Sequence, residues 1–95
     1  MLKLPQEILL SNLPQVWATL EAAMRAELAH LTSAAGQVLR LNAATLETFD
    51  SSALSLLLSA RRLCVQHALE LRIEGVPPKL RELARVYELG ELLWP

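Results

Sequence analysis

The chain has 95 residues, and 9 Lys and Arg face 10 Asp and Glu, so its formal net charge is -1. This balance excludes the basic footprint of a nucleic-acid-binding domain, and the length suits a single domain over residues 1–95. Hydrophobic residues make up 53% of the chain and the mean hydropathy is +0.30, high values for a small domain. We therefore expect some apolar surface to be covered by a partner protein.

The same composition bears on where the protein works. No apolar run reaches the length of about 18 residues that a membrane-spanning helix requires, so no direct membrane insertion is expected. Residues 1–5 do not have the pattern of a signal peptide. The single cysteine, Cys64, falls within a helical pattern and cannot form an internal disulfide. These features favour a cytoplasmic protein.

The N-terminal third predicts short strands followed by a helix. Residues 1–4 and 8–10 are two short apolar stretches, each compatible with a strand. Ser11 and Asn12 then offer a helix N-cap, and Pro14 suits a first helical turn. Apolar residues recur every three or four positions beyond that point, which predicts an amphipathic helix to about Leu31. They are Leu13, Trp17, Leu20, Met24, Leu28 and Leu31.

The middle of the chain predicts a buried strand and a second helix. Small residues at 32–36 form a loop, and residues 38–41 are apolar enough for a central strand. Asp50 or Ser51 caps the second helix, which runs to about His67. The first half of this helix is apolar around most of its circumference. Such a helix is either deeply buried or partly covered by another protein.

The C-terminal third predicts one more strand and helix. Apolar and charged residues alternate over 69–74, which is typical of a half-exposed strand. A turn over 75–78 leads to Pro78, which can begin a helix, and Gly90 is a plausible C-cap for it. The buried stripe of this helix is expected to be Leu80, Leu83, Ala84 and Tyr87.

Strands and helices thus alternate along the chain. Two consecutive strands joined through a helix of about 16 residues imply a parallel pair with a crossover connection. We therefore expect an α/β fold in which helices pack against a small mixed, largely parallel β-sheet.

Polar residues gather where the central strand gives way to the second helix. Asp50, Ser51 and Ser52 would lie just beyond the carboxyl end of a strand and at a helix N-terminus, where unpaired N–H groups and the helix dipole favour negative charge. Such a site can hold an anion, accept a phosphoryl group or present a small polar group to a partner. The plainer interpretation is that these side chains only cap the helix.

The remaining polar residues favour plainer roles. The basic residues of the last two helices form a solvated face or meet acidic groups of a partner; they are Arg61, Arg62, Lys79, Arg81 and Arg85. Cys64 and Trp17 fit core packing, while Trp94 either pins the tail or lies in an interface. His30 lacks a second metal ligand at i+4, and His67 near a helix end fits a surface residue that suits the helix dipole better than a ligand. With no phosphate-binding glycine loop and no nucleophile–base pair, we expect no enzyme activity, cofactor or metal.

The ordered set of segments resembles the STAS domain family, whose members include bacterial anti-sigma-factor antagonists. The resemblance rests on the strand at 38–41, the turn at 49–54, the leucine-rich helix, the strand at 69–74 and the segment at 75–80. It extends over residues 37–93 and only loosely over the N-terminal third. Ala53 departs from the family, which often has glycine at that position.

Residues 83–89 resemble the last helix of one branch, the STAS subunit of the Mla phospholipid-transport ABC complex of Gram-negative bacteria. This likeness implies an accessory subunit that binds the transporter's ATPase, and so lies peripherally at the inner membrane. The family places the partner-binding or phosphoacceptor surface around Ser51, with Asp50, Ser52, Ala53 and Leu54 beside it. The alternative is an anti-sigma-factor antagonist in which a partner serine kinase phosphorylates Ser51. A small-ligand or nucleotide sensor is a third possibility.

Overall fold

The computed structural model describes residues 2–30 and 37–94, and it contains the predicted strands and helices in the predicted order, with an additional short strand at Thr48–Phe49 that the sequence did not predict. The two N-terminal stretches both form short strands, and one short helix follows the last predicted one. The predicted loop at 32–36 and the helix end at Leu31 lie outside the described residues. The elements are β1 (Leu2–Lys3), β2 (Glu7–Ile8), α1 (Leu13–His30), β3 (Val38–Asn42), β4 (Thr48–Phe49), α2 (Ser52–Gln66), β5 (Glu70–Glu74), α3 (Pro78–Val86) and α4 (Gly90–Leu93).

The described strands pair in parallel. The main sheet has the order β1-β3-β5, and β2 and β4 form a second, two-stranded ladder. Leu41 of β3 pairs with Leu2 on one side and Ile73 on the other, so the strand predicted to be central is central. β3 and β5 are joined through α2, which confirms the predicted crossover and the largely parallel sheet.

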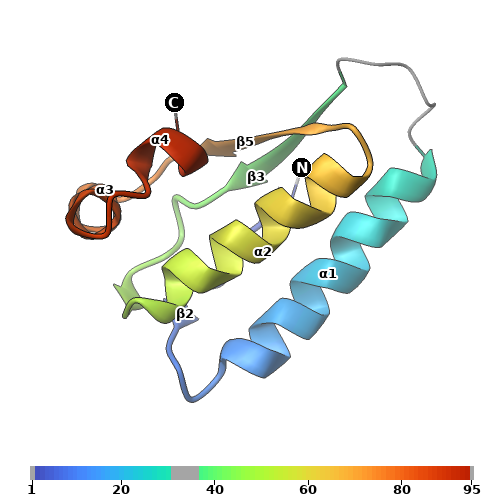
Figure 1. Ribbon diagram of the computed structural model, residues 1–95. Helices are drawn as coiled ribbons and strands as arrows, with labels where there is room; N and C mark the ends of the chain where they lie inside the picture. The colour runs from blue at the N-terminus through green and yellow to red at the C-terminus, as the bar shows by residue number, and fades with distance from the viewer. Residues whose placement is uncertain (1, 31–36, 95) are drawn as a thin grey trace.

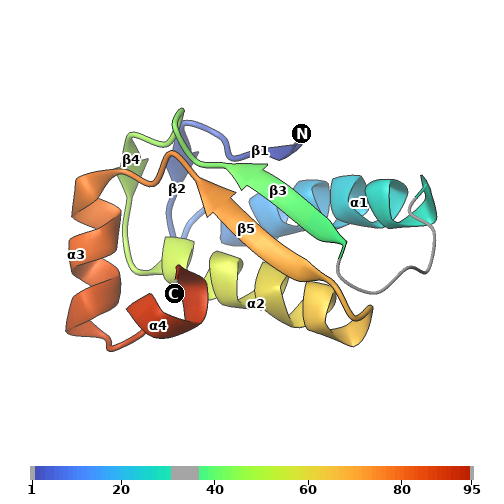
Figure 2. The same cartoon turned by 90° about the horizontal axis from the view of Figure 1, so that it is seen from above.

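The helices cover one face and one end of the main sheet (Figures 1 and 2). α1 and α2 lie side by side on one face of the main sheet, and α3 lies beyond the carboxyl ends of β3 and β5 (Figures 1 and 2). The α/β fold class is therefore confirmed. Charged residues alternate on the opposite face of the sheet, where Arg40 lies 3.7 Å from Glu74 and Arg72 lies 3.6 Å from Glu70. Exposed ion pairs of this kind contribute only about 0–1 kcal/mol each.

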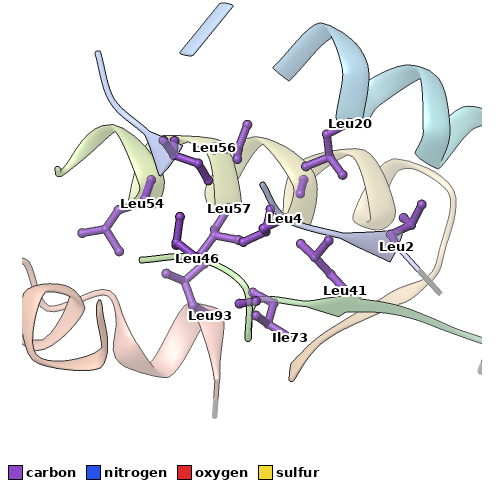
Figure 3. Close-up of a cluster of buried hydrophobic side chains, with 14 of the residues drawn as sticks. Leu2, Leu4, Leu20, Leu41, Leu46, Leu54, Leu56, Leu57, Ile73 and Leu93 are labelled. Carbon is purple, nitrogen blue, oxygen red and sulfur yellow. The ribbon is translucent and has the colours of Figure 1, made fainter. Parts of the chain in front are cut away.

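The core forms between α2 and the sheet. Leu54, Leu56 and Leu57 of α2 belong to the same cluster of buried side chains as Leu41 and Ile73 of the strands (Figure 3). Of the two interpretations of this apolar helix, deep burial therefore accounts for these leucines. Cys64 is also fully buried, as predicted, and burial raises the pKa of its thiol.

The end of α3 differs from the prediction. Gly90 does not cap this helix but begins α4, because the chain turns earlier, at Glu88, whose φ is 58°. The N–H of Leu89 donates to the carbonyl of Ala84 at 2.8 Å, which closes the helix with a left-handed residue. Tyr87 consequently leaves the predicted buried stripe and is 55% exposed.

Gly75 makes the turn after β5. Its φ is +68°, and a Cβ there would lie 2.9 Å from the Cβ of Ala44. A side chain at this position would be strained both by its backbone and by this close approach. The glycine therefore allows β5 to end against the loop that leads from β3 toward the candidate site.

Candidate functional site

Asp50 ties together the two loops at the start of α2. One carboxylate oxygen accepts the N–H of Ser52 at 2.8 Å, and the other accepts the N–H of Leu10 at 3.1 Å. The N–H of Asp50 in turn donates to the carbonyl of Ile8 at 3.3 Å, which extends the β2–β4 ladder. One carboxylate thus caps α2 and holds the loop after β2 against it.

These hydrogen bonds also set the charge of the site. The N–H of Leu10, followed by the N–H and the hydroxyl of Ser52, lowers the pKa of the Asp50 carboxyl below its ordinary value of 3.8. At neutral pH Asp50 is therefore ionised, and the helix dipole favours a negative charge at this position. The chain supplies its own anion to the N-terminus of α2, so the N–H of Ser52 is not free for an outside anion.

Ser51 is the residue that this arrangement leaves accessible. Its side chain is exposed and makes no capping hydrogen bond. Its carbonyl accepts the N–H of Leu54 at 3.0 Å, which fixes the residue as the start of the helix. Because Asp50 does the capping, the hydroxyl of Ser51 is left for contact with another molecule.

The other three predicted site residues face inward. Ser52 is 7% exposed, Ala53 is fully buried and Leu54 is 3% exposed. Ala53 stands where the family often has glycine, and its small side chain fits the core at this position. These residues shape the corner from inside, so the part of the predicted set that can meet a partner directly is Ser51 and the half-buried Asp50.

Residues outside the predicted set complete the surface around Ser51. A shallow hollow of about 170 Å³ opens beside it. Its lining residues are Ser51, Leu54, Ser55, Leu58, Tyr87 and Leu89. Leu10, whose N–H is held by Asp50, adds a side chain that is 73% exposed. The helical spacing of Ser51, Ser55 and Leu58 was visible in the sequence. No sequence signal brings Tyr87 and Leu89 to this site, since they arrive through the turn between α3 and α4.

Comparison with protein-family models finds one match, to the model described as "Mlab, STAS domain", over residues 1–94. The chain belongs to the STAS domain family. No curated protein matches this STAS domain. STAS domains generally mediate protein–protein interactions. An accessible hydroxyl beside exposed apolar side chains is compatible with such an interaction.

Within residues 2–30 and 37–94 no group of three His, Cys, Asp or Glu side chains lies together to hold a metal ion. In the same part of the chain, no helix combines the length and apolarity needed to cross a bilayer. The predicted basic residues are distributed over α2 and α3.

Trp94 has a structural contact of its own. The guanidinium of Arg81 lies 5.3 Å from the centroid of its ring, in a cation–π arrangement, and the side chain packs against the core. Arg81 and Arg85 line a depression of about 720 Å³ together with Glu88 and Glu91. Because both signs of charge line it, this depression has no clear preference for an anion. Through its contacts with Arg81 and the core, Trp94 pins the tail against α3.

Proposed function

We propose that this STAS domain is a non-enzymatic binding subunit that docks onto the ATPase of an ABC-type phospholipid transporter through the surface around Ser51. The observation that carries the proposal is the exposed Ser51 side chain, which makes no capping bond and stands beside an apolar hollow. The description of the matching family model supports the transporter branch of the family. The apolar rim formed by Leu10 and Tyr87 supports a protein partner.

Binding at this surface needs no chemical step. A partner side chain that enters the hollow removes the exposed parts of Leu58, Tyr87 and Leu89 from water. This burial stabilises the complex by roughly 25 cal/mol for each Å² of apolar surface covered. The small size of Ser51 leaves the hollow open, and Asp50 keeps the neighbouring loop in place. A large side chain at position 51 would fill the hollow. A charged side chain there would lose its hydration when the partner binds, which is unfavourable.

Co-purification with the ATPase subunit of the same organism tests this proposal. Ser51→Arg and Ser51→Glu should abolish co-purification, while the circular dichroism spectrum and melting temperature stay near those of the wild type. Ala22→Arg places the same new side chain on an exposed position of α1 that lines none of the hollows described, and it should leave the complex intact. A complex that survives both Ser51 variants would show that the partner docks elsewhere.

A second candidate is an anti-sigma-factor antagonist in which Ser51 accepts a phosphoryl group from a serine kinase. The observation in its favour is again the exposed Ser51 side chain that makes no capping bond. Phosphorylation would add roughly 1.5 to 2 negative charges. The helix dipole would favour this charge by about 1 kcal/mol, and the ionised Asp50 would oppose it. The fold would therefore tolerate the phosphate, whereas an apolar docking surface would not.

Intact-mass analysis of the protein from its native host distinguishes the two candidates. A phosphoryl group that phosphatase removes, and that Ser51→Ala prevents, would support the antagonist. If no growth condition yields the heavier species, the phosphoacceptor function is eliminated and the docking subunit stands alone.

A further inference from the structure

The hollow beside Ser51 is one of three shallow hollows along the exposed side of α2. The second, of about 230 Å³, lies between the start of α1 and α2, and the third, of about 290 Å³, follows farther along the same two helices. The second is lined by Leu13, Pro14, Trp17, Ser55, Leu56 and Ser59. The third is lined by Trp17, Glu21, Arg25, Ser59, Arg62, Leu63 and Gln66.

Shared residues join these hollows into one surface. Ser55 lines the first and the second, and Ser59 and Trp17 line both the second and the third. We call this continuous surface the α2 trough. Its floor follows α2 from Ser51 to Arg62, a length of about 16 Å at the rise of an α-helix. That length matches three turns of a second helix laid along it.

The two ends of the α2 trough differ in character. Aliphatic and aromatic side chains line most of the two hollows nearest Ser51, whereas charged and amide side chains line most of the third. At that end Arg25 is paired with Glu21 at 3.2 Å. Arg62 is exposed and has no ion-pair partner among the residues that the structure describes. Residues 52–66 contain two arginines and no acidic residue, so this end attracts a negative group.

We propose that the α2 trough holds one amphipathic α-helix of the partner, whose apolar side chains lie over Ser51, Ser55 and Ser59 and whose acidic side chain meets Arg62. The inference rests on the proposed docking function and names the structural element that docks. The floor of the trough carries small serine side chains, so the partner helix can approach α2 closely.

The backbone of α2 explains why the partner is a helix rather than a strand. Along the trough the N–H and C=O groups of α2 are bonded within the helix, so the floor offers side-chain contacts only. An extended segment laid there would bury backbone groups without partners, which is unfavourable. A helix satisfies its own backbone and can present apolar and acidic residues on one face.

Affinity for the purified ATPase subunit, measured by calorimetry or biolayer interferometry, tests the trough. Ser59→Arg should raise the Kd at least about tenfold by filling the second and third hollows, whereas Ala22→Arg should leave it within about twofold. Arg62→Glu should raise the Kd about three- to tenfold, more strongly at low salt, because it reverses the charge that meets the partner. Lys79→Glu makes the same charge change at the exposed start of α3 and should have little effect.

The outcomes separate this inference from the function on which it rests. Loss of affinity in Ser51→Arg and in Ser59→Arg supports the trough. Loss in Ser51→Arg alone, with Ser59→Arg and Arg62→Glu like the wild type, overturns the trough and leaves docking at Ser51 in place. Wild-type affinity in all three variants overturns both.

A photo-crosslinking residue at position 59 tests the nature of the occupant. We expect an adduct with a helical segment of the ATPase that carries an acidic residue within about two turns. An adduct with an extended segment, or with a helix lacking such a residue, would overturn the proposed occupant.

Discussion

The two faces of α2 have different roles: the inner face stabilises the fold, and the outer face carries the proposed binding surface. The inner face carries Leu57 and Cys64, both fully buried, and belongs to the hydrophobic core. The outer face carries Ser51 and Ser55, both exposed. The inner side chains named here are apolar, while the two outer ones are small and polar. Substitutions on one face should therefore change stability, and substitutions on the other should change binding.

The largest expected effect tests the inner face. Leu57→Ala removes a fully buried side chain from the centre of the core and should lower the free energy of unfolding by about 2–5 kcal/mol, as measured by urea denaturation. Val65→Ala removes a side chain that is 57% exposed on the same helix and should change it by no more than about 0.5 kcal/mol. Equal losses in the two variants would contradict the division between the faces.

A stabilising substitution at the end of α2 sharpens the comparison, because it touches neither face. Ala68 has a φ of 57°, and the N–H of Leu69 closes the helix on the carbonyl of Cys64 at 2.9 Å. Ala68→Gly should relieve this left-handed strain and raise the free energy of unfolding by roughly 1 kcal/mol, with no change in affinity for the ATPase. Ala22→Gly, in the interior of α1, should lower it by about the same amount.

The smallest expected effect is the pH dependence of the stability that Asp50 contributes. Because the pKa of Asp50 is lowered in the folded protein, its ionised form stabilises the fold at pH values above 3.8, and this contribution is lost as the pH falls through the lowered pKa. Asp50→Asn should therefore be less stable than the wild type at pH 5–7, and the gap should narrow in strong acid. A gap that stays constant in urea titrations down to pH 2 would contradict this role for Asp50.

Local periodicity was sufficient for most of the fold. The three-to-four spacing of apolar residues located α1, and the alternation around Ile73 located β5. The helix between two apolar strands then implied their parallel pairing. Helix ends were less predictable. The sequence suggested Gly90 as the cap of α3, whereas the left-handed residue that closes this helix is Glu88. Asn12 likewise turns its side chain back to accept the N–H of Leu9 at 2.7 Å, rather than forward onto α1.

The candidate site was only partly predictable for a similar reason. Ser51 and Asp50 follow from their place at a strand-to-helix corner, which the sequence locates. The burial of Ser52 and Leu54 depends on how α2 is rotated against the sheet, and the arrival of Tyr87 depends on where α3 ends. Both are set by tertiary packing, for which a single sequence carries little local signal.

The burial of Cys64 has a practical consequence. Its thiol is fully enclosed and its pKa is raised, so reagents that attack thiolates should spare it in the folded protein. As Cys64 is the only cysteine in the chain, a second one introduced at position 55 would provide the only accessible thiol for a maleimide dye. The native chain is thus already suited to fluorescence anisotropy and spin-label measurements, with no need to replace its own sulfur first.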